Sequence, residues 1–288
     1  MRHHRFRFIN KLLIKPYSTL LTLFLCVVSS FLFGQSYSIL YKVSYQPVAD
    51  LKERKTEYMM LEVNNHTSRF YSLDQKKLDS MVQANDPALS DSYESPNLKF
   101  EVYKDLGTKK SWVSADFNDV TYTYEEPALT YELVKTNMEK QGNYSMKQAW
   151  TNAGGREWAI FYTEDVPLFV GPYIFSGLPG MVFKAISSDM DYEISFVGIQ
   201  KYNQIREIKL PKANITKEKY AKQIQEFLKN PGHHSIMYKN IWGDRFHYNF
   251  KTASPAVIKQ QEELIKKITS RFNNPLDKEV YLFDIIVP

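Results

Sequence analysis

The chain has 288 residues, of which 43% are hydrophobic, 15% aromatic and 24% charged. This composition is typical of a folded globular protein, so it excludes disordered, collagen-like and coiled-coil chains. The net charge of +5 comes from the N-terminus: residues 1–34 hold five basic residues and no acid, and the other 32 basic residues balance 32 acidic ones. Because the body has no basic excess to neutralise phosphates, the sequence argues against a nucleic-acid partner.

Residues 1–34 have the pattern of a secretory signal peptide. A basic segment up to Lys15 precedes a mostly apolar run from Leu20 to Phe33, and the small Gly34 is followed by polar residues. As a helix this run would rise about 21 Å, which is less than the roughly 30 Å of a bilayer core. We therefore predict export with cleavage after Gly34, and a membrane contact only if the leader is retained.

The single cysteine, Cys26, lies within this apolar run. Lipidation would need small residues before it, whereas Phe24 and Leu25 stand there. If the leader is removed, the mature chain has no cysteine, which excludes disulfides, cysteine-zinc sites and thiol nucleophiles.

After the leader, alternating apolar and polar side chains predict a series of β-strands. Asn64-Asn65 and Gly154-Gly155 are typical hairpin turns between neighbouring strands. A short helix is expected at 74–84 and a loop at 85–97. The strands are expected at 37–46, 57–63, 66–73, 98–104, 111–115, 119–125, 129–136, 144–152, 156–163, 181–186, 191–200 and 204–210.

Two helices are expected in the C-terminal third. Residues 217–229 carry an apolar stripe at helical spacing behind a possible cap at Thr216, and residues 255–272 begin after Ser254 with a proline in the first turn. The apolar tail 279–288 is expected to be a final strand or docking segment. Together these elements predict one α+β domain over residues 35–288. It would be a curved, twisted antiparallel sheet of about 8–11 strands, a meander or half-barrel, with both helices packed on it.

Residues 164–180 contain three prolines and three glycines among large apolar side chains. Such a loop is stiff before folding and is poorly solvated, so it should fold back onto the core. Leu178-Pro179-Gly180-Met181 suits a type II turn, with glycine supplying the positive φ. Two interpretations remain open: a rigid packed connection between strands, or the preorganised lip of a binding site.

The run from Gly171 to Val182, which includes Gly177-Leu178-Pro179-Gly180-Met181-Val182, resembles the signature of the GLPGLI family of exported Bacteroidetes-type proteins. Asn273-Asn274-Pro275-Leu276 is similar to that family's terminal motif. The family often has a cysteine before the tryptophan strand, where this chain has Met146. The resemblance implies a Gram-negative envelope, in the periplasm, at the outer membrane or outside the cell, and an uncharacterised role.

The loop and the resemblance together single out a candidate binding loop. Its residues are Gly171, Pro172, Tyr173, Phe175, Gly177, Leu178, Pro179, Gly180 and Met181. Tyr122, Tyr124, Trp112, Trp150 and Trp158 could extend a binding face or could form the core.

Catalytic and metal sites are not predicted, and no cofactor is expected. His233, His234 and His247 lack the spacing of metal ligands, and the acid pair Glu125-Glu126 is expected at a solvated surface. The leading hypothesis is therefore a non-enzymatic binding or assembly module of the cell envelope, whose partner is an envelope protein or an apolar ligand. The alternatives are a carrier of an apolar small molecule or lipid inside the curved sheet and, third, a hydrolase.

Overall fold

The structure is a computed structural model that describes residues 36–84, 96–117, 120–135, 139–202, 207–229, 236–239, 245–248 and 254–280. The predicted signal peptide, most of the expected loop 85–97, His233, His234 and the tail 281–288 lie outside these residues. None of the described helices is long and apolar enough to cross a membrane.

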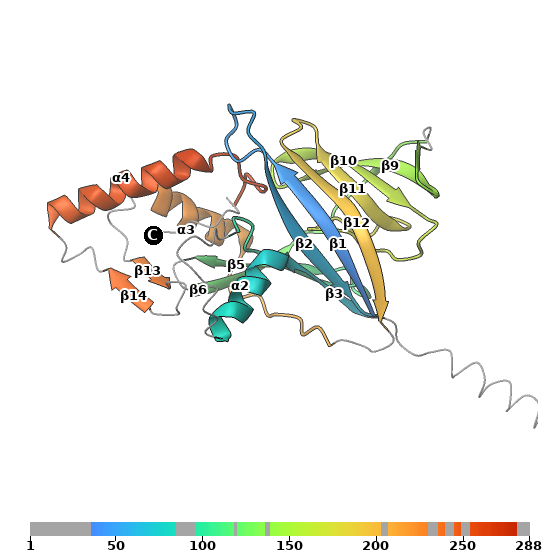
Figure 1. The fold of residues 1–288 in the computed structure, drawn as a ribbon, viewed down its shortest axis with the longest axis horizontal. Helices are drawn as coiled ribbons and strands as arrows, with labels where there is room; N and C mark the ends of the chain where they lie inside the picture. The colour runs from blue at the N-terminus through green and yellow to red at the C-terminus, as the bar shows by residue number, and fades with distance from the viewer. Residues whose placement is uncertain are drawn as a thin grey trace, which may run out of the picture.

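A 12-stranded antiparallel sheet dominates the described chain (Figure 1). The strand order is β6-β5-β4-β3-β2-β1-β12-β11-β10-β9-β7, with β8 beside β9. The strands are β1 (Ser36–Tyr45), β2 (Lys55–Val63), β3 (Thr67–Ser72), β4 (Glu101–Asp105), β5 (Ser111–Phe117), β6 (Val120–Glu126), β7 (Glu132–Leu133), β8 (Glu139–Gln141), β9 (Tyr144–Ala153), β10 (Arg156–Thr163), β11 (Met181–Ser187) and β12 (Tyr192–Tyr202).

The sheet is two meanders joined by one long-range pairing. Strands β1 to β6 follow one another on one side, β9 to β12 follow one another on the other, and β1 pairs with β12 along its whole length. The predicted hairpin turns are confirmed, and Gly154 and Gly155 have φ angles of 58° and 68°. The expectation of an antiparallel sheet built from sequential strands is therefore confirmed.

The two edge strands of the sheet, β6 and β7, are joined by residues 127–131 alone. The sheet therefore curves until its edges approach each other. The open edge of β6 is covered by Asn214, whose backbone N–H donates to Thr123 O (2.9 Å) and whose side-chain Oδ1 accepts from Thr123 N (2.9 Å). Such coverage prevents an unpaired strand from recruiting another chain.

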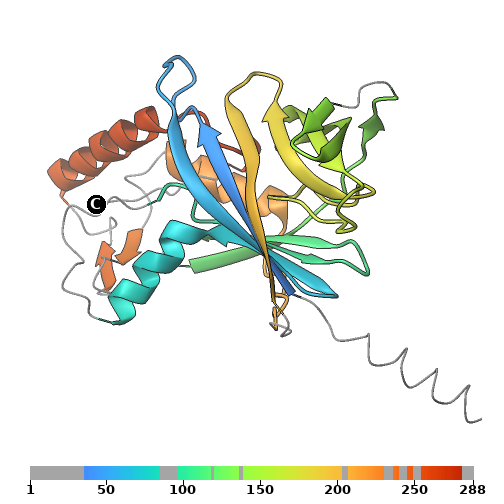
Figure 2. The same ribbon diagram turned by 45° about the vertical axis from the view of Figure 1, so that its right-hand side comes forward.

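In the described part of the chain three helices accompany the sheet: α2 (Leu73–Gln83), α3 (Lys217–Lys229) and α4 (Pro255–Arg271). In both ribbon views α3, in orange, and α4, in red, lie side by side at one end of the molecule (Figures 1 and 2). Helix α3 packs on β6, where Tyr220 stacks on Tyr124 with ring centroids 5.6 Å apart. Helix α4 joins α3 through Ile265, which clusters with Phe227. The expectation that both helices pack on the sheet is thus met directly by α3.

Several expectations about single elements are wrong. The described part of the expected strand 129–136, residues 129–135, holds only the two-residue β7, because Leu129 and Tyr131 turn inward to pack on the core. Residues 207–210 are irregular. The structure adds β8 and a separate hairpin, β13 (Ile236–Lys239) with β14 (Arg245–Tyr248), that the sequence pattern did not indicate. Strands this short have too few residues to show a periodicity.

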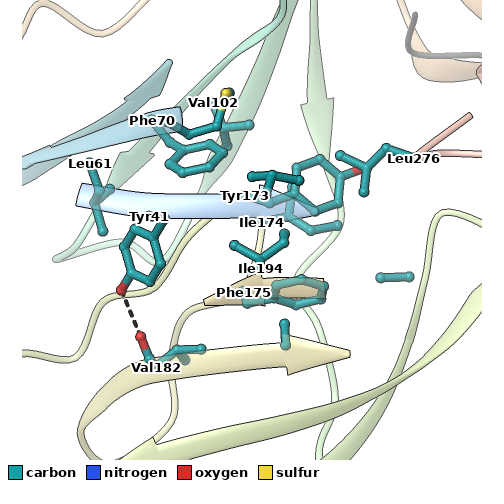
Figure 3. Packing of buried hydrophobic residues seen from close by; sticks show 14 of the residues in the cluster. Tyr41, Leu61, Phe70, Val102, Tyr173, Ile174, Phe175, Val182, Ile194 and Leu276 are labelled. Carbon is teal, nitrogen blue, oxygen red and sulfur yellow. Dashed lines mark hydrogen bonds between the residues drawn. The ribbon is translucent and has the colours of Figure 1, made fainter. Parts of the chain in front are cut away.

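Aromatic side chains fill the inner face of the curved sheet. Tyr41, Tyr124 and Trp158 have no exposed surface. These aromatic side chains therefore belong to the core and do not form a binding face. The close-up of this core shows Tyr41 and Phe70 from the first meander beside Val182 and Ile194 from the second, with the hydroxyl of Tyr41 donating to Val182 O at 2.6 Å (Figure 3). The two meanders therefore share one core.

Candidate functional site

The segment between β10 and β11, residues 164–180, is here called the motif loop. Its central part enters the core: Tyr173 and Phe175 have no exposed surface, and their rings lie among Phe70, Val102 and Ile194 (Figure 3). Phe175 packs on Trp158 with ring centroids 5.0 Å apart. The interpretation of the loop as a rigid packed connection is therefore correct for this half.

Close backbone contacts explain the glycines of the motif loop. A Cβ at Gly171 would lie 2.3 Å from Phe175 O, and one at Gly180, whose φ is 152°, would lie 2.0 Å from Thr163 O. The expected type II turn is replaced by a tighter one, in which Gly180 N donates to Leu178 O at 2.8 Å around Pro179. The tighter turn lets the chain enter β11 directly alongside the end of β10.

Two side chains, one from β4 and one from the connection between β6 and β7, hold the backbone of the motif loop. The buried Lys104 of β4 donates from Nζ to Gly171 O (3.1 Å) and to Phe175 O (3.2 Å). The hydroxyl of Tyr131 donates to Ser176 O (3.0 Å) and accepts from Ser176 N (3.1 Å). Buried carbonyl and N–H groups of an irregular segment need such partners.

The two segments that resemble family motifs meet in space. The Tyr173 hydroxyl donates to Asp277 Oδ2 at 3.2 Å, directly after the Asn273–Leu276 stretch. The buried Arg156 donates to Asn274 Oδ1 and to Pro275 O (2.8 Å for the latter), and it also pairs with Asp189 and Asp191. The C-terminal stretch is therefore tied to the motif loop and to β10.

A lysine of α3 forms ion pairs with three carboxylates next to the contact between Tyr173 and Asp277. Lys217 Nζ lies 2.7 Å from Glu126 Oε1, 3.3 Å from Asp277 Oδ2 and 2.9 Å from Glu279 Oε2. Burial raises the pKa of Glu126 to about 7, because the charged carboxylate loses its hydration. Lys217 offsets only part of this desolvation cost, since its one ammonium group is shared by three carboxylates. Glu126 is thus a buried partner of Lys217, and the expectation of a solvated Glu125-Glu126 pair is wrong for Glu126.

This charge cluster predicts a pH-dependent stability. The pKa of Glu126 is higher in the folded chain than its ordinary value of 4.5, so its contribution is fully present below pH 4.5 and is lost as the pH rises through about 7. We expect Glu126→Gln to be as stable as the parent at pH 4 and more stable at pH 8, by up to about 3 kcal/mol. Urea unfolding at both pH values measures this difference.

The control for this prediction is Glu125→Gln. Glu125 is half-exposed and pairs with Lys110, so its replacement should change the free energy of unfolding equally and only slightly at both pH values. Parallel pH profiles for Glu126→Gln and the parent would contradict a buried, late-ionising Glu126.

A cavity of about 720 Å³ opens beside the outer half of the motif loop. Its walls are the motif loop, the turns after β2 and β4, and residues 127–131 that join the sheet edges. Exposed Gly177 and Pro179 line it together with Leu178 and with Phe169, which is 61% exposed. This half of the loop has the position expected of a lip.

A row of polar side chains crosses the inner face of the sheet at the level of this cavity. Ser68, Lys104, Ser111 and Glu126 are direct cross-strand partners on β3, β4, β5 and β6, and all are buried. Lys104 and Ser111 also line the cavity. The hydroxyl of Ser68 is buried without a hydrogen-bond partner. The row places Lys104 and Ser111 next to the apolar side chains of the wall, while Asn64, Asn65, His66, Asp105 and Lys109 line other parts of the cavity.

The structure divides the predicted site residues into two groups. Gly171, Pro172, Tyr173, Phe175, Gly180 and Met181 are buried and support the fold, whereas Gly177, Leu178 and Pro179 line the cavity. Lys104 and Ser111 were missed. The signal was present, because Leu98, Phe100 and Val102 alternate inward and Lys104 continues the same face.

Metal-binding geometry is not found among the described residues. No group of three histidine, cysteine, aspartate or glutamate side chains there is placed to hold a metal ion. A second hollow of about 810 Å³, beside α3, is lined by Glu126, Lys217 and Glu279, so the lysine already occupies the space between the acids.

The comparisons with known proteins add little beyond the fold. No protein-family model matches the chain, and no curated protein matches it. Two solved structures of PNGF-II, in C2 and P21 space groups, are similar with TM-scores of 0.45 and 0.43 and with 15% and 14% sequence identity. Each match covers 72% of this chain and 35% of the other, so the chain spans about a third of the length of PNGF-II.

Proposed function

We propose that the chain is an exported protein of a Gram-negative cell envelope that acts as a non-enzymatic binding or assembly module. The resemblance of Gly171–Val182 to the GLPGLI signature and the leader pattern of residues 1–34 support the location. We also propose that the sheet and both C-terminal helices form one α+β domain.

The observation that carries the binding role is the cavity beside the motif loop. One half of the loop is anchored in the core and the other half forms the rim, so the rim is positioned before any ligand arrives. Preorganisation reduces the ordering entropy lost on binding. A hollow of about 720 Å³ whose wall combines apolar side chains with several polar groups has the form of a ligand site.

Two other hypotheses have less support. A carrier that holds its cargo inside the curved sheet would need an empty interior, whereas Tyr41, Trp158 and Phe175 occupy that volume. A hydrolase would need a histidine or an acid pair converging in one cleft, whereas the buried acids Glu126 and Asp277 both lie against Lys217 Nζ.

The proposal is tested with the tagged mature chain and an envelope extract. We expect the parent to enrich a protein or a lipid, and Phe169→Ser to lose most of that enrichment, because the side chain lies at the cavity rim. Mass spectrometry of proteins and lipids in the eluate gives the measurement.

The matched control is Met190→Ser. Met190 is 62% exposed, close to the 61% of Phe169, and lies in the β11–β12 turn outside the cavity. It should retain the enrichment of the parent. Equal capture by the parent and Phe169→Ser, or no capture by either, would contradict a binding role for this rim.

A further inference from the structure

The polar end of the cavity contains a buried lysine, Lys104, and the proposed function does not say which ligand this lysine would bind. Lys104 Nζ is buried and donates to two backbone carbonyls, and among the described residues no carboxylate lies within ion-pair distance of it. A buried ammonium group is normally paired with an acid. This lysine lacks the counter-charge that the protein supplies to Arg156 and Lys217.

The hydrogen-bonding capacity next to Lys104 is also incomplete. A protonated lysine donates three hydrogen bonds, and two are used by Gly171 O and Phe175 O. Ser111, its direct partner on β5, contributes a hydroxyl to the same cavity. On the other side, Ser68 has a fully buried hydroxyl with no partner. An anion is the group that would accept from such a cluster of donors.

Apolar side chains elsewhere in the cavity wall would contact the rest of the ligand. Leu129, Leu168, Phe169, Ile174 and Leu178 line the cavity, and Pro167 and Pro179 add apolar surface. Burying an alkyl chain there would be favourable, because each methylene is removed from water. The wall therefore favours an apolar body, while the lysine end favours a negative charge.

We infer that the cavity binds an apolar molecule with a terminal carboxylate, which lies against Lys104 and Ser111 with its alkyl part along the motif loop. This inference rests on the proposed function and specifies its ligand. Burial lowers the pKa of Lys104 to about 7, and a bound carboxylate would supply the charge that stabilises its protonated form. In this role the motif loop both forms the rim and presents its carbonyls to the lysine that holds the ligand.

The test compares decanoate with decan-1-ol, which share an alkyl chain and differ at the polar end. We expect calorimetric titration of the mature chain to show decanoate binding at least tenfold tighter, because a charge-assisted hydrogen bond adds more than a neutral one. Lys104→Met should bind both probes with equal affinity, and Phe169→Ser should weaken both equally.

A second variant keeps the test decisive if Lys104→Met does not fold. Ser111→Ala leaves the lysine in place and should reduce the preference for decanoate about threefold, in line with the loss of one hydrogen bond. Equal affinity of the parent for the two probes, binding of neither, or an unchanged preference in Ser111→Ala and Lys104→Met would overturn the inference. If neither probe binds while the envelope pull-down still depends on Phe169, the ligand class is wrong and the binding function stands.

Discussion

Replacing Gly180 with alanine is expected to lower the free energy of unfolding by about 3 kcal/mol, through a steric clash and a strained φ. The new Cβ would lie 2.0 Å from Thr163 O and 2.6 Å from the carbonyl carbon, and a backbone atom cannot move aside as a side chain can. The φ of 152° adds a conformation that residues with a Cβ rarely adopt. Denaturant unfolding of the purified chain measures the loss.

Gly177→Ala separates the two causes. Gly177 also has a positive φ, of 90°, but a Cβ there would meet nothing within 4 Å. Its replacement should cost only about 1 kcal/mol, the conformational part of the penalty. If both alanine variants lose the same amount, the close approach of the motif loop to β10 is not what the Gly180 position requires.

Arg156→Met is expected to have the other large effect, a loss of about 3–5 kcal/mol. The guanidinium has no exposed surface and binds Asp189, Asp191, Asn274 and Pro275, so its removal leaves carboxylates and a buried carbonyl without their donor. The C-terminal stretch would lose its main connection to β10. Denaturant unfolding monitored by tryptophan fluorescence reports the change, since Trp158 lies in the same strand.

Arg69→Met is the matched control for this effect. Arg69 pairs with Glu101, but both side chains are about one-third exposed, at 32% and 31%. Water can solvate the remaining partner, so the expected cost is about 1 kcal/mol. A similar loss for the two arginine variants would mean that the burial of Arg156 does not set its contribution.

These variants also show why the motif loop has its composition. Its glycines let the backbone approach Thr163 and Phe175, and its aromatic residues fill the space between the two meanders. The exposed residues at its other end are free of these packing demands. A ligand site can therefore vary at Phe169 or Pro179 without disturbing the core.

Local patterns in the sequence predicted most of the secondary structure. Period-two alternation located the long strands, and β10 and α3 have the predicted bounds of residues 156–163 and 217–229. Caps at Thr216 and Ser254 were also predicted, and their hydroxyls accept from Lys219 N and Val257 N. These features depend on neighbouring residues, so a single sequence contains their cause.

Neighbouring residues along the chain thus account for the strand periodicity, the hairpin turns, the helix starts and the stiff apolar character of residues 164–180. The pairing of β1 with β12, the contact of Tyr173 with Asp277 and the position of Lys104 beneath the motif loop became visible in the folded chain alone. Those contacts join residues separated by 67 to more than 100 positions in the chain. Their geometry follows from the curvature and pairing order of the whole sheet, which no local pattern of side chains encodes.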